Sequence, residues 1–288
     1  MTRPPLVADQ GFVEVADRVW VARHSWFDVN VTVVGGEQGL VVVDTHASEP
    51  AMREVLDALR RVTPAEVVGV VNTHAHFDHT LGNAVMREHA PVHAHEAAAA
   101  ATVEAGERAK RLYAADPDDP HAEEVLASRI VPATETFSSV RVLDLGDRVL
   151  ELVHPGRGHT SGDVVVRVAD ADVLLAGDLV EQSAPPSYGP DSYPLDWPGA
   201  LDFVVGLLTP ASVVVPGHGD LVDQPFVQDQ RSDVGIVAET VFDLVSRSVP
   251  LEDALRHQEW PWPAEHLEHA VRRGYDHVPR TARRLPLV

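Results

Sequence analysis

The 288-residue chain has no cysteine, few basic residues and no long uninterrupted hydrophobic run. The absence of cysteine excludes disulfides, thiol nucleophiles and thiolate metal ligands, so any metal would have to bind nitrogen and oxygen donors. Lys and Arg total 23 against 44 Asp and Glu, which gives a formal net charge of −21. Because such a charge repels polyanions, we expect neither nucleic acid nor an anionic membrane surface as a partner.

Charged residues or glycine interrupt every apolar run, which is not the pattern of a membrane span. The first twelve residues lack the apolar stretch of an export signal. We therefore expect a cytoplasmic protein that acts on a small-molecule substrate. An oligomer is compatible with the sequence.

Short β-branched runs fall into two groups, within 13–95 and within 140–215, and predict two sets of strands. Apolar residues at helical spacing predict helices after Pro50 and over 96–115, 121–130, 226–247 and 264–274. The sequence therefore predicts a mixed α/β (α+β) fold. We predict one domain over 1–222 and a C-terminal helical extension over 223–288 that packs on it.

The segment HAHFDH holds four potential metal ligands directly after an apolar run, namely His74, His76, Asp78 and His79. On a helix His74 and Asp78 would share a face while His76 and His79 pointed elsewhere, so we predict an extended strand end and a tight turn that direct all four inward. Imidazoles and a carboxylate suit Zn²⁺, Fe²⁺ or Mn²⁺. Four donors exceed by one the set that a single catalytic zinc usually takes from protein, which favours two metals.

Three later segments each place a potential ligand beside glycine after a β-like run: His159, Asp178 and His218. Glycine gives the backbone freedom to turn such a side chain inward at a strand end. Taken in order, HAHFDH, GRGHTSGD, AGD and PGHG resemble the successive motifs of the metallo-β-lactamase fold superfamily. The resemblance spans roughly residues 13–220.

The resemblance implies an αββα sandwich with two metal ions, zinc in the first instance and iron or manganese as alternatives. The implied ligands are His74, His76 and His159 for the first ion, Asp78, His79 and His218 for the second, and Asp178 as the bridge. Asp44 matches a family position that supports the metal loop without binding the ion. Asp78 would also assist proton transfer.

Two metals about 3.5–4 Å apart would create a bridging hydroxide that attacks a carbonyl or phosphoryl centre. The resemblance therefore implies hydrolysis of a small ester, thioester, lactone or amide, as in glyoxalase II-like thioesterases and lactonases. A secreted β-lactamase fits less well, because such enzymes usually carry another residue at the position of Asp178. Alternatives are a mononuclear iron sulfur (persulfide) dioxygenase, a phosphodiesterase or ribonuclease, and a metal-stabilised binding protein without catalysis.

The segment 183–198 contains five prolines in sixteen residues and predicts an ordered loop near the site. Within it, Tyr188 and Tyr193 either donate a hydrogen bond to a substrate carbonyl or oxyanion, or pack as amphipathic side chains. Arg157 either binds a substrate carboxylate or forms a surface ion pair. We include both tyrosines among the predicted catalytic residues.

Overall fold

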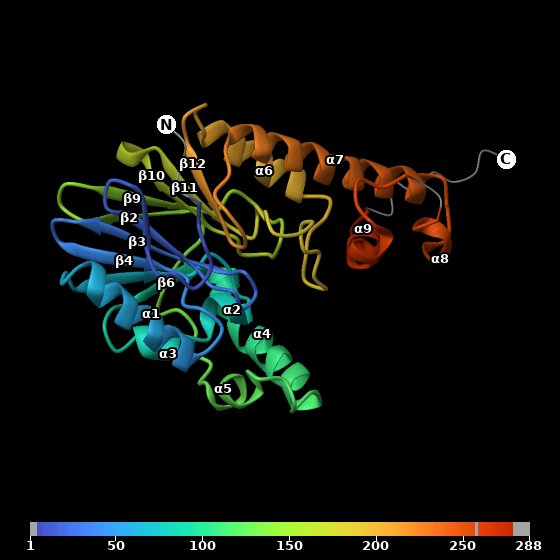
Figure 1. Ribbon diagram of the computed structural model, residues 1–288. Coiled ribbons are helices and arrows are strands. Elements are labelled where there is room, and N and C mark those ends of the chain that lie inside the picture. The colour runs from blue at the N-terminus through green and yellow to red at the C-terminus, as the bar shows by residue number, and fades with distance from the viewer. Residues whose placement is uncertain (1–4, 257–258, 279–288) are drawn as a thin grey trace.

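The computed structural model describes residues 5–256 and 259–278, and within them two sheets lie face to face with helices on both outer sides (Figure 1). This αββα layering is the predicted mixed α/β fold. The predicted domain ranges include residues 1–4, 257–258 and 279–288, which lie outside the described residues.

The first sheet holds seven strands in chain order: β1 (Val13–Ala16), β2 (Val19–Arg23), β3 (Asn30–Gly36), β4 (Gly39–Val43), β5 (Val67–Val71), β6 (Val92–His95) and β7 (Glu135–Phe137). Strands β1 to β4 form an antiparallel meander, and β4 to β7 run parallel. Helix α1 (Glu49–Val62) connects β4 to β5. Its first turn contains Pro50, and the Ser48 hydroxyl accepts a hydrogen bond from the Ala51 amide, so the predicted helix start is confirmed.

The second sheet holds five strands in the order β12 (Val213–Pro216), β11 (Val173–Gly177), β10 (Val165–Val168), β9 (Val149–Val153) and β8 (Val140–Asp144). Successive side chains of a strand point to opposite faces, so one face of each sheet can be buried against the other. Val41 and Val43 of the first sheet share a buried cluster with Leu150, Leu152 and Val166 of the second. This cluster forms the core between the sheets.

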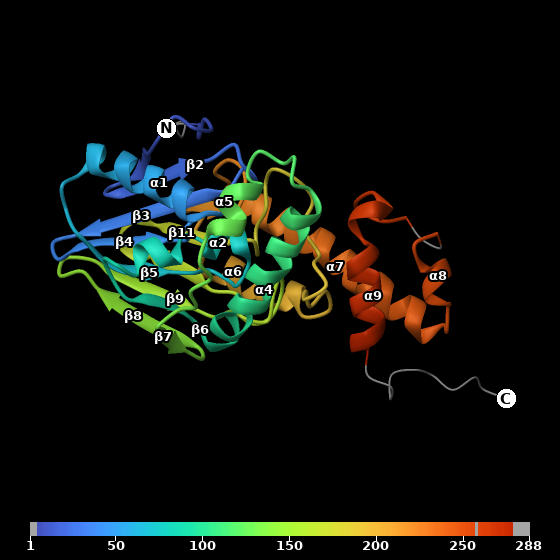
Figure 2. The same cartoon turned by 90° about the horizontal axis from the view of Figure 1, so that it is seen from below.

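Two helices cover the outer face of the second sheet, namely α6 (Trp197–Leu207) and α7 (Gln224–Ser246). Helix α7 continues past the sandwich, where α8 (Leu251–Ala254) and α9 (Glu268–His277) lie beside its far end (Figures 1 and 2). Among the described residues, none of the helices combines the length and the hydrophobicity of a membrane span. The predicted loop 183–198 ends inside α6, because Trp197 is fully buried and begins that helix.

Helix α3 (Asn83–Met86) packs beside α1 against the first sheet, whereas α2 (Phe77–Thr80), α4 (Glu96–Ala115) and α5 (Ala122–Ala127) lie near one edge of the sandwich. The segments that follow β5, β11 and β12 meet at this same edge, beside the connection from β9 to β10. The Val164 amide donates to the Thr73 carbonyl across 2.7 Å, which joins two of these segments directly. The predicted ligands therefore come from both sheets.

Candidate metal centre

The HAHFDH segment is only partly the extended turn that the sequence predicts. His74 and His76 precede α2, whereas Asp78 and His79 lie inside its single helical turn. The Thr45 hydroxyl and the Asn72 side-chain amide each donate to the His79 carbonyl at 3.1 Å. These buried hydrogen bonds position the short helix, and all four predicted ligands still point into one site.

The first group of potential ligands joins His74, His76, His159 and Asp178, whose ligand atoms lie within 4.8 Å of one another. The His159 Nε2 atom lies 2.8 Å from His76 Nδ1 and 3.4 Å from Asp178 Oδ2. His74 Nε2 lies 3.7 Å from the same carboxylate oxygen. Two donors that bind one tetrahedral zinc at about 2.1 Å are roughly 3.4 Å apart, so this group has the spacing of a single-ion site.

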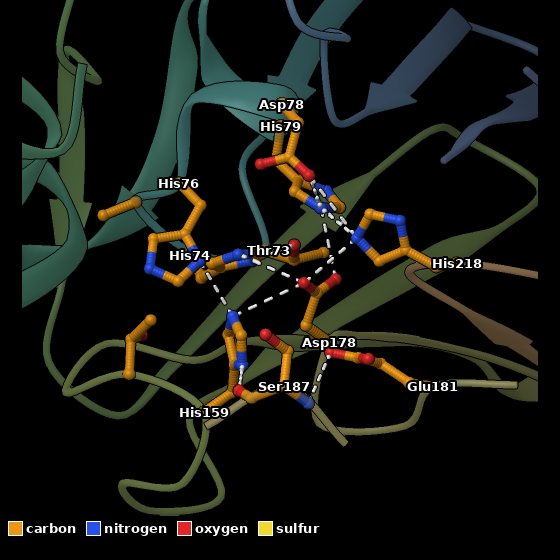
Figure 3. Close-up of polar contacts among 12 residues, drawn as sticks. Thr73, His74, His76, Asp78, His79, His159, Asp178, Glu181, Ser187 and His218 are labelled. Carbon is orange, nitrogen blue, oxygen red and sulfur yellow. Dashed lines mark hydrogen bonds and ion pairs between the residues drawn. The ribbon is translucent and has the colours of Figure 1, made fainter. Parts of the chain in front are cut away.

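The second group joins Asp78, His79 and His218. His218 Nε2 lies 3.3 Å from His79 Nε2 and 3.5 Å from Asp78 Oδ2. The carboxylate of Asp178 faces this group as well, with Oδ1 3.1 Å from His79 Nε2 and Oδ2 3.1 Å from His218 Nε2. Figure 3 shows the Asp178 carboxylate between the two groups, as expected for a bridging ligand.

Two glycines make room for the Asp178 carboxylate. Gly177 has a φ of +53°, a left-handed conformation that favours glycine, and it turns the chain directly before Asp178. A Cβ atom at Gly217 would collide with Asp178 Oδ1. The Gly-Asp and Gly-His pairs are therefore steric requirements of this site.

Two of the candidate ligand histidines use their second ring nitrogen for a hydrogen bond with a backbone carbonyl. His159 Nδ1 lies 3.0 Å from the Ser187 carbonyl oxygen, and His218 Nδ1 lies 2.7 Å from that of Phe27. A proton on each Nδ1 donates to the carbonyl and leaves Nε2 free to bind a metal. The backbone thus selects the tautomer that a metal site needs.

Asp44 makes the supporting contacts predicted for it. Its carboxylate accepts hydrogen bonds from the Thr73 amide and hydroxyl, both at 2.8 Å, and lies 2.9 Å from His79 Nδ1. Asp44 itself has a φ of +64°, an uncommon conformation for a residue with a side chain. The strained residue thus holds one ligand histidine and the backbone before another.

Asp191 makes a comparable contact that sequence reasoning missed. Its Oδ2 atom lies 3.2 Å from His76 Nε2 and 2.8 Å from Arg108 Nη2. Burial alone would raise the pKa of Asp191, but the hydrogen bond and charge of His76 and the guanidinium of Arg108 outweigh burial and lower the pKa. Because Asp191 occupies Nε2, His76 offers Nδ1 to the first group.

The charges in the site favour a bound cation. Burial lowers the pKa of His159 to about 4 and that of His74 well below its ordinary value, so both rings are neutral donors. Burial would also lower the pKa of His218, but the carboxylates of Asp178 and Asp78 outweigh it and raise that pKa to about 10. Without a metal, protons therefore supply the positive charge that these carboxylates attract.

The buried atoms also fit a metal ion. His74 Nε2 and Asp178 Oδ1 are buried and make no hydrogen bond among the described residues, although Asp178 Oδ1 lies 3.1 Å from His79 Nε2. Buried polar atoms are normally satisfied, and coordination to a metal would satisfy both. The donor set, its spacing and its unpartnered atoms all fit divalent metal ions.

A cavity of about 370 Å³ opens beside the two groups and is lined by His76, Asp78, His159, Asp178 and His218. Its other walls come from α4, from Phe27 and Phe77, and from the segment 181–191. A substrate in this cavity would therefore contact the metal ligands directly.

Comparison with known proteins agrees with this geometry. The family model of the metallo-β-lactamase superfamily matches residues 24–218. The chain belongs to this superfamily. A type 2 metallo-β-lactamase from Bacillus cereus is 27% identical over 197 residues, which cover 68% of each chain. One from Elizabethkingia meningoseptica is 22% identical over 205 residues, covering 70% of this chain and 73% of the relative.

Solved structures show the same metallo-β-lactamase fold. A metallo-β-lactamase from Pontibacter korlensis matches with a TM-score of 0.61 and 25% identity, over 78% of this chain and 98% of that one. The sec-alkylsulfatase Pisa1 from Pseudomonas sp. matches with a TM-score of 0.72 and 18% identity, over 92% of this chain and 50% of that one. At 18% identity, the match to Pisa1 shows only that the two proteins share the fold.

The structure does not bring the two predicted tyrosines to the metal groups of this superfamily member. Tyr188 is buried in the cluster beneath α6, edge-on to Trp197 at 5.0 Å between ring centroids. Tyr193 stacks on His277. Neither is among the described residues that line the cavity. Their catalytic role remains a prediction, and their placement favours the alternative of packing.

Arg157 forms a surface ion pair, which is the second of the two roles considered for it from the sequence. Its Nη2 atom lies 2.6 Å from Asp196 Oδ2, and both side chains are about half exposed. The guanidinium also lies over the Tyr193 ring at 4.4 Å. Arg157 is not among the described cavity-lining residues, so it is placed for an ion pair and ring packing.

Proposed function

We propose that this superfamily member is a hydrolase that uses two zinc ions to cleave a small-molecule ester, thioester, lactone or amide. The observation that carries the proposal is the position of the Asp178 carboxylate, which lies within 3.1–3.7 Å of ligand nitrogens from both groups. When bound, the ions would lower the pKa of a water molecule between them and polarise the scissile carbonyl. Nucleophilic side chains are then not required.

The residues of the chain would orient the reaction and move its proton. His74, His76 and His159 would hold one ion, while Asp78, His79 and His218 would hold the other. Asp78 lines the cavity, and its Oδ2 atom faces His79 and His218. Its Oδ1 atom would then take a proton from water and pass it to the leaving group.

Which of the ester, thioester, lactone and amide bonds the protein cleaves is part of the proposal. β-Lactams are cyclic amides and belong in a substrate screen, because the relatives described above are metallo-β-lactamases. Polyanionic phosphodiesters are poor candidates, because the net charge of −21 disfavours them.

A reconstitution assay tests the function. Protein stripped of metal by a chelator is titrated with zinc and assayed on an acyl ester, an acyl thioester, a lactone and a β-lactam. We expect hydrolysis of at least one of these to rise with zinc up to about two ions per chain. Oxygen consumption with a single iron, or the absence of any metal-dependent hydrolysis, would contradict the proposal.

A matched pair of histidine variants controls the assay. His218→Ala removes a ligand and should lower activity by more than about 100-fold, beyond the roughly 10- to 100-fold typical of residues that only support ligands. His266→Ala removes an exposed histidine in the short 3₁₀ segment Ala264–His266 and should leave activity unchanged.

A further inference from the structure

One face of α4 forms an apolar wall of the catalytic cavity. Ala105, Ala109 and Leu112 line the cavity at positions i, i+4 and i+7, the spacing of a single helix face. Phe27 and Phe77 line it as well, with their rings edge-on at 5.4 Å. A ligand in the outer part of the cavity would therefore contact carbon on more than one side.

Two of these apolar side chains are exposed to solvent. Leu112 is 67% exposed and Phe27 is 42% exposed, although both line the cavity. Phe27 also has a φ of +64°, an uncommon backbone conformation for an aromatic residue. Exposed apolar side chains gathered at a cavity mark a surface that an apolar ligand would cover.

The described lining of the cavity offers no unpaired lysine or arginine. Among the described residues that line the cavity, Arg108 is the one lysine or arginine, and its guanidinium is paired with Asp191 at 2.8 Å. Asp191 in turn holds the ring of His76. A carboxylate on the substrate would therefore lack a free partner here, unless it broke the Arg108 ion pair.

Resting on the proposed hydrolytic function, we propose that the substrate presents an uncharged, apolar acyl or alkyl group to α4. Leu112 and Phe27 then determine specificity by favouring such a group over one that ends in a carboxylate. Transfer of the apolar group from water to the cavity wall supplies the binding energy. An anionic group gains little from Arg108, because the guanidinium is already paired with Asp191.

Matched substrates of equal length test this selectivity. The p-nitrophenyl ester of hexanoic acid is compared with the p-nitrophenyl monoester of adipic acid, which ends in a carboxylate. We expect kcat/KM at least about tenfold higher for the neutral ester. Equal or higher kcat/KM for the carboxylate ester would overturn the inference.

Variants on opposite faces of α4 locate the effect. Leu112→Ser should lower kcat/KM for the hexanoate ester by about 3- to 10-fold, mainly through KM, because the contact is apolar. Val103 lies on the same helix, half a turn away in rotation, and is 49% exposed. Val103→Ser is the control and should leave kcat/KM unchanged. Equal effects of the two variants would contradict the assignment of Leu112.

A positive charge introduced at Leu112 should shift the preference toward the substrate with a carboxylate. Leu112→Arg should raise kcat/KM for the adipate monoester by about 3- to 10-fold and lower it for the hexanoate ester. Val103→Arg adds the same charge to the opposite face and controls for the change in net charge. If both arginine variants favour the adipate monoester equally, long-range charge rather than the cavity wall determines the preference.

A binding measurement separates this inference from the hydrolytic function. The neutral apolar dye N-phenyl-1-naphthylamine is titrated by fluorescence into the wild type, Leu112→Ser and Val103→Ser. We expect Kd to rise about 3- to 10-fold in Leu112→Ser alone. Binding that depends on Leu112 in a protein without hydrolase activity would support the inference and contradict the proposed function. Binding that is indifferent to Leu112 would overturn the inference, whatever the activity.

Discussion

Two carboxylates hold ligand histidines from outside the metal groups, and they use different ring nitrogens to do so. Asp44 contacts Nδ1 of His79, whereas Asp191 contacts Nε2 of His76. The nitrogen that remains on each ring faces a candidate metal group, so the two carboxylates would specify which atom binds a metal. The contact between Asp191 and Arg108 also links the ligand set to the α4 wall.

Removal of the Asp191 carboxylate should weaken the first metal group. Asp191→Ala leaves His76 Nε2 without its acceptor, and we expect zinc affinity to fall by about 10- to 100-fold. Competition with a chromophoric zinc chelator measures the change. Asp196→Ala is the matched control, because it removes an acidic residue of the same loop that pairs with Arg157 instead. Equal zinc affinity in the two variants would show that Asp191 does not position His76.

At the scale of single residues, the candidate metal ligands are easier to predict from the sequence than the residues that hold them in place. The seven candidate ligands share short motifs with glycine and follow apolar runs, and the structure brings all of them together. Asp191 has no such signal, because it is one of 44 acidic residues and lies 115 positions from His76. The same limit applies to Tyr188, whose packing on Trp197 depends on a helix that the sequence did not predict.

The turn after β12 positions His218 through its backbone. The Asn30 side-chain amide of β3 donates to the carbonyls of Pro216 and Gly219 at 3.0 and 2.9 Å. The Asn30 backbone N–H also donates to the Gly217 carbonyl at 2.9 Å. One buried residue of the first sheet therefore positions the turn of the second sheet that carries His218.

A methyl group in this turn should displace the bridging carboxylate. Gly217→Ala would place a Cβ against Asp178 Oδ1, so we expect bound zinc to fall below two ions per chain. Elemental analysis measures the loss. Gly206→Ala is the control, because a Cβ there meets open space within α6 and should stabilise the helix by about 0.5–1 kcal/mol. Full zinc content in Gly217→Ala would contradict the close packing around Asp178.

The start of α1 depends on a charged contact far along the chain. The Glu49 carboxylate accepts hydrogen bonds from the Arg129 amide and Nε at 2.9 and 2.8 Å, and from Arg53 at 2.8 Å. Chiefly the hydrogen bond from the Arg129 side chain lowers the pKa of Glu49 to about 2. A lowered pKa stabilises the fold above the unfolded value of about 4.5, and this stabilisation is lost as the pH falls through 2.

Glu49→Gln should therefore destabilise the protein in a pH-dependent way. We expect a loss on the order of 1 kcal/mol at pH 7, because solvent screens the partly exposed arginines. The difference from wild type should shrink between about pH 4.5 and 2. Urea unfolding at several pH values measures it. A difference that stays constant over this range would show that the Glu49 charge is not responsible.

Long patterns are predictable at the scale of elements, and short ones are not. The helix 96–115 and the strand Val67–Val71 have the bounds that their composition predicts. Strand β7 has three residues and helix α2 has four, too few to show a period. Helix α6 begins in the proline-rich segment, where Pro198 is favourable in the first turn but also typical of a loop.

The two sheets contribute different members of each metal group. His74 and His79 follow the first sheet's β5, whereas His159, Asp178 and His218 follow strands of the second. Bound metal would therefore connect the two halves of the sandwich. The division into 1–222 and 223–288 stays a prediction, and Val227 and Val234 of α7 already lie in the cluster that covers the second sheet.

Metal removal should therefore lower the stability of the whole molecule. Ligand present at about 1,000 times its Kd stabilises a protein by about 4 kcal/mol, which corresponds to roughly 10 °C in Tm for a chain of this size. Calorimetry with excess zinc and with a chelator measures the shift. His218→Ala should show a smaller shift than wild type. Identical Tm values for wild type under both conditions would argue against a metal that joins the two sheets.

The most direct test of the central claim is the metal content per chain, measured by elemental mass spectrometry on protein purified without added metal. The bridging position of Asp178 predicts about two zinc ions in the wild type and a fall toward one in Asp178→Ala. A single iron ion per chain, or no bound metal in the wild type, would contradict the binuclear site on which the proposed function rests.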